Sequence, residues 1–215
     1  MNVIAINGSP RKEWNTAILL NKALEGAQSV GAETELVHLY DLDYKGCTSC
    51  FACKIKGGKS EGRCAMKDDL TPLLERLESA DAVIMGSPIY FGSTTGELRS
   101  FQERFAFPYL QYTNPPSSVF SGKINIGFIY TMNVSEETML KFGYNRFFEL
   151  SEGWATRGFK GCTQSLWVCD TLQFADYSKV VSGYFDPEKK KARREEVFPA
   201  DCERAFEFGV SLVQI

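Results

Sequence analysis

The chain has 215 residues, of which 44% are hydrophobic, and this length suits one domain whose central sheet is covered on both faces. A formal net charge of −3 and a pI near 5.4 exclude a general binder of nucleic acids or of anionic membrane surfaces. The single histidine, His38, falls in an expected strand, where we expect it to pack, so catalysis by histidine is nearly excluded.

Two features predict a cytoplasmic protein. No apolar stretch approaches the roughly 18 residues needed to span a bilayer. The apolar run at residues 1–6 lacks a basic n-region and is shorter than a signal peptide. In that setting an odd number of cysteines, seven, fits free thiols or metal ligands better than a disulfide framework.

The first loop of the chain has the composition of an anion site. A buried strand at residues 1–6 is followed by Gly8-Ser9-Pro10-Arg11 and by a helix that begins near Asn15-Thr16. A helix start directs unpaired N–H groups and partial positive charge to one spot, which favours a phosphate. Ser9, Asn15 and Thr16 can donate hydrogen bonds, and Arg11 adds charge. A solvated turn of ordinary turn residues has the same composition and remains the alternative.

Further strands and helices alternate along the rest of the chain. Apolar runs predict strands, and amphipathic spacing predicts helices. We expect strands over 33–40, 82–85, 123–130 and 164–168, and helices over 68–77, 95–107, 135–148 and from Pro199 onward, with Cys202, Ala205, Phe206 and Val210 facing inward. Two segments, 43–67 and 109–122, are expected to be loops. The charged run at 188–196 mixes acids with bases, so we interpret it as a solvated helix face and not as a nucleic-acid patch.

This alternation predicts an α/β protein with a five-stranded parallel sheet in the order 2-1-3-4-5. In such sheets ligands bind beyond the carboxyl ends of the strands where the order reverses, here between the first and third strands. The third strand is followed by Pro88, Ile89, Tyr90, Phe91 and Gly92, and the fourth ends in Thr131-Met132-Asn133. A flat aromatic ligand with a phosphate tail suits these loops, and flavin mononucleotide (FMN) has this shape.

The chain resembles the flavodoxin-like NAD(P)H-dependent FMN oxidoreductases, which include NADPH-dependent FMN reductases, multimeric flavodoxins and iron-sulfur flavoproteins. Four stretches carry the resemblance over roughly the first 130 residues: Gly8–Arg11 with Asn15-Thr16, Cys47-Cys50-Cys53 with Cys64, Lys67–Asp69, and Gly86–Gly92. Trp14 departs from the small residue often found in that loop. The resemblance implies one flavodoxin-like three-layer domain over 1–215, with a cysteine-rich loop at 43–67 and a C-terminal extension at about 170–198.

The resemblance also implies which residues bind FMN. The phosphate is assigned to Ser9, Arg11, Asn15 and Thr16. The isoalloxazine ring is assigned to Pro88, Ile89, Tyr90, Phe91 and Gly92, and Thr131 closes the third side. The flavin itself carries the chemistry, so no catalytic side chain is expected.

The expected activity is ping-pong hydride transfer from NAD(P)H to quinones, flavins or similar small acceptors. An electron carrier between protein partners is a second hypothesis, and a regulatory module that uses the fold without flavin is a third. Relatives of this type imply a homodimer or homotetramer. No nucleic-acid or membrane partner is expected.

Four cysteines share the loop at 43–67, in the spacing Cys47-x2-Cys50-x2-Cys53-x10-Cys64. Four thiols in one loop are the ligand set of a [4Fe-4S] cluster, and a zinc site takes the same set. The last spacing is longer than the compact pattern of the iron-sulfur flavoproteins. Thiols that only pack in the loop, or a redox pair formed by two of them, are the remaining alternative.

Overall fold

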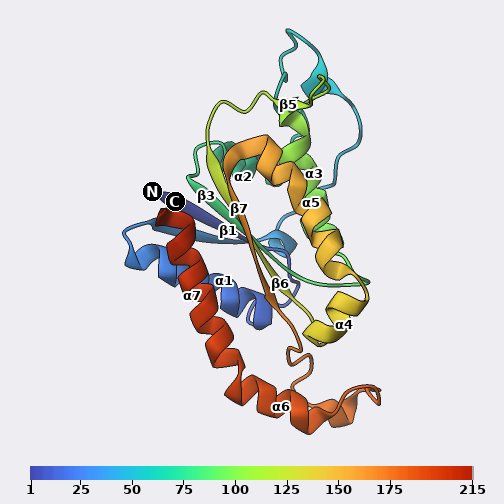
Figure 1. Cartoon of the computed structure of the whole chain (residues 1–215). Helices are drawn as coiled ribbons and strands as arrows, with labels where there is room; N and C mark the ends of the chain where they lie inside the picture. The colour runs from blue at the N-terminus through green and yellow to red at the C-terminus, as the bar shows by residue number, and fades with distance from the viewer. Residues whose placement is uncertain (215) are drawn as a thin grey trace.

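A five-stranded parallel sheet forms the centre of the molecule (Figure 1), as seen in a computed structural model that describes residues 1–214. The strand order is β2-β1-β3-β6-β7, which confirms the predicted order 2-1-3-4-5. The strands are β1 (Asn2–Asn7), β2 (Glu33–His38), β3 (Ala82–Pro88), β6 (Ile124–Thr131) and β7 (Lys160–Val168). All four neighbouring pairs are parallel, so every carboxyl end lies at the same edge of the sheet.

Helices cover both faces of the sheet, which gives three layers (Figure 1). One face carries α1 (Asn15–Ser29) and α7 (Phe198–Gln214), and the other carries α2 (Leu70–Leu77), α3 (Gly96–Ala106) and α5 (Tyr144–Phe159). Two further α-helices are α4 (Glu136–Lys141) and α6 (Pro187–Glu196). None of the helices in residues 1–214 has the length and apolar character needed to cross a membrane.

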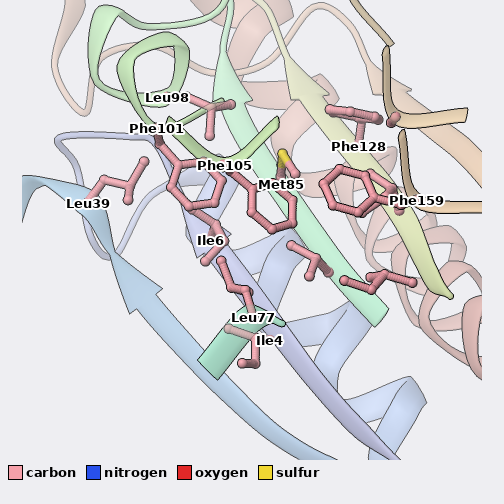
Figure 2. Packing of buried hydrophobic residues seen from close by; sticks show 14 of the residues in the cluster. Ile4, Ile6, Leu39, Leu77, Met85, Leu98, Phe101, Phe105, Phe128 and Phe159 are labelled. Atoms are coloured by element: carbon pink, nitrogen blue, oxygen red, sulfur yellow. The ribbon is translucent and has the colours of Figure 1, made fainter. Parts of the chain in front are cut away.

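The period-2 alternation of the strands divides the core into two clusters. Ile4 and Ile6 of β1 point to the face covered by α3 and α5, where Figure 2 shows them below a group of phenylalanines. Val3 and Ala5 point to the opposite face, against α1 and α7. Because β1 and β3 are buried on both faces, they read as continuous apolar runs, which is why the sequence predicts them well.

The structure differs from the expected elements in the segment 109–168. The helix expected over 135–148 is two helices, because Gly143 adopts a left-handed conformation (φ +72°) and ends the first. Helix α5 then runs to Phe159, and Lys160 (φ +61°) turns the chain directly into β7. The expected loop at 109–122 contains a small hairpin, β4 (Leu110–Gln111) and β5 (Ser117–Ser118).

Two expectations about the C-terminal helices are confirmed only in part. Helix α6 forms, but it is not simply a solvated face: Lys190 is only 3% exposed and donates to the Asn133 carbonyl and the Asp170 carboxylate. Helix α7 buries Ala205 as expected, but Cys202, Phe206 and Val210 are only half-buried. The inward face of α7 instead includes Gly209, which lies against α1. A Cβ on Gly209 would lie 1.8 Å from the Ala23 carbonyl oxygen, so the two helices can approach this closely only because the residue is a glycine.

Candidate functional site

The loops that follow β1, β3 and β6 meet at the carboxyl edge of the sheet and enclose a cavity of about 120 Å³. Of the ten residues assigned to a cofactor, all but Phe91 and Gly92 line it. The lining also contains Trp14, Met132, Asn133, Thr171 and Gln173. Three larger cavities, of about 220, 270 and 370 Å³, lie elsewhere in the described residues, and none of them shares a lining residue with this one.

The start of α1 forms one end of the cavity. Trp14 precedes the helix and no side chain caps it, so the first N–H groups of α1 have no acceptor within the helix. The loop before it is fixed in place, because Gly8 N–H donates to the Gly86 carbonyl (2.8 Å) and Thr95 Oγ1 donates to the Gly8 carbonyl (2.7 Å). Unpaired N–H groups and the helix dipole therefore face a preformed pocket.

Side chains around this helix start are polar and buried. Ser9 and Thr16 are almost fully buried, and Ser9 Oγ accepts the Arg11 N–H at 3.1 Å. The hydroxyls of Thr16 and Thr131 are 2.8 Å apart, which joins the first loop to the end of β6. Arg11 stacks on the Trp14 ring, with 3.9 Å between the guanidinium carbon and the ring centroid. Trp14 stands where the resembling family often has a small residue, and its ring holds Arg11 beside the cavity.

A short segment after β7, residues 170–173, covers the same helix start, and we call it the strap. Thr171 anchors it, because its N–H and hydroxyl both donate to the Met132 carbonyl, at 3.0 and 3.1 Å. The carbonyls of Leu172 and Gln173 then accept hydrogen bonds from Trp14 Nε1 (3.1 Å), Asn15 Nδ2 (2.7 Å) and Arg11 Nη1 (2.6 Å). The strap was not predicted from the sequence, although ligands bind beyond the carboxyl ends of parallel strands and β7 ends at the same edge as β1.

The other end of the cavity is open and aromatic. Tyr90 and Ser93 bond each other's backbone (2.8 and 3.1 Å) across a tight turn in which Phe91 and Gly92 have φ of +52° and +79°. Phe91 is fully exposed and Tyr90 is 46% exposed. One further atom at the cavity lacks a partner: Asn133 Oδ1 is buried with no hydrogen bond among residues 1–214, so it offers an acceptor to a hydroxyl group.

The four cysteines of the loop 43–67 line one hollow, together with Arg104 and Phe107 at the end of α3. The hollow has a volume of about 20 Å³, room for about one water molecule. Cys64 Sγ accepts a hydrogen bond from Arg104 Nε at 3.1 Å, and burial raises the pKa of the Cys53 thiol. Within residues 1–214 no three His, Cys, Asp or Glu side chains are grouped closely enough to hold a metal ion. In this conformation the loop contains the four cysteines that a [4Fe-4S] cluster needs, but the hollow between them is too small to hold the cluster.

This hollow is remote from the strand-end cavity. It adjoins Glu103 and Arg104 near the end of α3, whereas Thr95 at the start of that helix contacts Gly8. At 1.5 Å per residue, the eleven residues of α3 separate the two places by about 15 Å. The other cysteines, Cys162, Cys169 and Cys202, are also unpaired.

A family described as "NADPH-dependent FMN reductase" matches the chain over residues 1–157. Two curated relatives are iron-sulfur flavoproteins, from Methanocaldococcus jannaschii (39% identical over 104 residues) and Archaeoglobus fulgidus (40% over 104 residues). Each match covers 48% of this chain and 51% or 48% of the relative, so the chain spans about half the length of these relatives.

Solved structures share the fold over almost the whole chain. An NAD(P)H:quinone oxidoreductase from Methanothermobacter marburgensis has a TM-score of 0.71 at 17% identity, covering 99% of this chain and 98% of its own. An azoreductase from Bacillus anthracis has a TM-score of 0.67 at 14% identity, covering 98% and 99%. A flavodoxin from the domain Archaea has a TM-score of 0.51 at 11% identity, covering 100% and 97%. At these identities the likeness shows the fold, which is flavodoxin-like as expected.

Proposed function

Since the chain belongs to the NADPH-dependent FMN reductase family, we propose that it is an FMN-dependent NAD(P)H oxidoreductase that reduces quinones, flavins or similar small acceptors. One observation carries the proposal: the uncapped start of α1 faces a cavity that the ends of β3 and β6 complete. An uncapped helix start favours a phosphate, and an aromatic turn on the other side favours a flat ring.

The residues of the cavity divide between the two ends of FMN. Ser9, Arg11, Asn15 and Thr16, with the first N–H groups of α1, bind the phosphate. Thr131 and Asn133 also line the cavity, and the unpaired Asn133 Oδ1 and the Thr131 hydroxyl suit the hydroxyl groups of the ribityl chain. The cavity of about 120 Å³ is smaller than the roughly 300 Å³ of a typical ligand site, so the ring lies outside it, against the open end.

The turn Pro88–Gly92 forms that open end, and its exposed aromatic side chains contact the ring. When bound, FMN accepts a hydride from the nicotinamide and passes electrons on to the acceptor. The protein orients the ring and holds the phosphate, and no side chain is required as an acid or base.

An absorbance spectrum of the purified protein tests this function. We expect a flavin spectrum, or its appearance on titration with FMN, and bleaching when NADPH or NADH is added without oxygen. Protein that binds no FMN at any concentration tested would refute the proposal and favour a regulatory module that uses the fold without flavin. Bound flavin that neither nicotinamide reduces would instead favour an electron carrier.

A four-thiolate centre in the loop 43–67 is a second candidate, as in an iron-sulfur flavoprotein. It is supported by the common hollow of Cys47, Cys50, Cys53 and Cys64 and by the names of the curated relatives. The hollow does not fit a cluster as it lies, so the loop must open to bind one, and no step of the proposed reaction passes through it. Measuring iron and acid-labile sulfide in anaerobically purified protein tests this candidate. Zinc in place of iron and sulfide would identify a zinc site with the same four ligands.

We also propose that the chain assembles into a homodimer or homotetramer. Phe91 and Tyr90 expose aromatic surface at the open end of the cavity, where a second copy would cover the ring. Sedimentation of the purified protein measures the assembly, and a monomer at micromolar concentration would contradict it.

A further inference from the structure

Helix α6 carries an arginine that contacts Asn15, one of the residues lining the cavity, and that lies outside both the predicted site and the residues of the family match. Arg194 lies 179 positions from Asn15, yet its Nη1 donates to Asn15 Oδ1 at 2.8 Å. Its guanidinium stacks on the Phe198 ring, 3.9 Å from the centroid. The family match ends at residue 157, so this contact belongs to the C-terminal extension.

The charge of Arg194 has no counter-ion. The two other basic residues of α6 that are not fully exposed are paired: Lys190 with Asp170, and Arg193 with Asp201. Arg194 is half-buried and forms no ion pair with a carboxylate in residues 1–214. Burial lowers its pKa, and none of the groups that influence its pKa is a carboxylate. An arginine stays protonated even so, and a half-buried cation without an anion is costly.

Asn15 connects this cation to the start of α1, where we place the phosphate. The side chain is 6% exposed, with Oδ1 bonded to Arg194 and Nδ2 bonded to the Leu172 carbonyl of the strap. Arginine has only donors and a carbonyl only accepts, so these two partners determine which way the amide points. Asn15 is also the first residue of α1, where the free N–H groups lie.

We propose that Arg194 is a further binding residue for the phosphate end of the cofactor, which it stabilises by its unpaired charge and by holding Asn15 against the strap. The inference rests on the proposed function, since it assumes a phosphate at the start of α1. A dianionic phosphate there supplies the counter-ion that Arg194 lacks. Riboflavin has the same ring without the phosphate, so Arg194 contributes to binding of FMN and not of riboflavin.

The experiment compares FMN and riboflavin binding by flavin fluorescence quenching in three proteins: wild type, Arg194→Met and Lys191→Met. Lys191 lies on the same helix, is exposed and forms no ion pair in the described chain, so its variant removes an equal charge away from the cavity. For Arg194→Met we expect FMN to bind about 10-fold or more weakly, with riboflavin affinity unchanged. Lys191→Met should leave both affinities unchanged. Inorganic phosphate should compete with FMN in wild type more strongly than in Arg194→Met.

Different outcomes separate this inference from the proposed function. If wild type binds neither flavin, the proposed function fails. If wild type binds FMN and Arg194→Met loses affinity for both flavins equally, or for neither, Arg194 has a structural role or none, and the inference is wrong. Arg194→Lys keeps the charge, so it should retain part of the FMN preference. Arg194→Gln also removes the charge, and it replaces Arg194→Met in the comparison if the methionine variant does not fold.

Discussion

Replacing Gly8 with alanine tests whether the loop between β1 and α1, to which we assign the phosphate, depends on its close contact with α3. An added Cβ would lie 2.7 Å from Leu98 Cβ and 3.1 Å from the Gly86 carbonyl oxygen, whereas ordinary contacts are 3.4–4 Å. Leu98 is fully buried and Gly86 belongs to β3, so neither can move away without disturbing the core. The loop must shift instead, by more than half an ångström, which also strains the 2.8 Å bond from Gly8 N–H to Gly86.

Overpacking of this kind costs about 1–3 kcal/mol of unfolding free energy. For a chain of this length we therefore expect a melting temperature lower by about 2–10 °C, together with weaker FMN binding because the start of α1 moves with the loop. Urea unfolding followed by circular dichroism measures the stability, and flavin fluorescence measures the binding.

Gly96→Ala is the matched control for this change. Gly96 opens α3 in the same region, and a Cβ there meets no atom within 4 Å, so the variant should be as stable as wild type or slightly more so. If Gly8→Ala keeps both the stability and the FMN affinity of wild type, the loop is not held by this contact and the reasoning is wrong.

Three other changes have expected results that follow from single contacts. Thr95→Ala removes the cap of α3 and the bond to the Gly8 carbonyl, and it should cost about 1–2 kcal/mol in urea unfolding. Asp68→Asn leaves the fully buried Arg104 guanidinium without its carboxylate and should cost about 3–5 kcal/mol. Burial raises the pKa of Asp68, but the hydrogen bond and the charge of Arg104 outweigh this effect, so the pKa lies below its ordinary value of 3.8. The stability that this ion pair contributes should therefore be lost as the pH falls below 3.8. Burial raises the pKa of Glu152 to about 7, so between pH 4.5 and 7 the folded state keeps a proton that the unfolded state has released. The free energy of unfolding should therefore fall as the pH rises from 4.5 to 7, and Glu152→Gln should make it less dependent on pH in that range.

The strands of the sheet could be predicted because each one is marked by a short apolar run in the sequence. Strands buried on both faces need continuous apolar residues, and β3 and β6 carry them, so their number, order and approximate bounds follow from the sequence. The break at Gly143 was not predictable in the same way. Glycine tolerates both helical and left-handed backbone, and only the packing of α5 on β6 and β7 decides between them.

The candidate site also has a part that the sequence predicts and a part that only side-chain packing decides. The loops after β1, β3 and β6 could be assigned to one edge from strand order alone, because parallel strands place their carboxyl ends together. The thiol loop could be recognised as a ligand set, but its hollow, closed around Arg104 and Cys64, is a matter of side-chain packing.

The sequence by itself determined the alternation of strands and helices, the helix start that favours a phosphate, and the family, since each depends on residues close together in the chain. Only the tertiary structure decided what covers that helix start. The bonds from Arg11 to Gln173 and from Arg194 to Asn15 join residues 162 and 179 positions apart. No local pattern encodes such contacts, because they exist only after β7 and α6 have packed against the rest of the sheet.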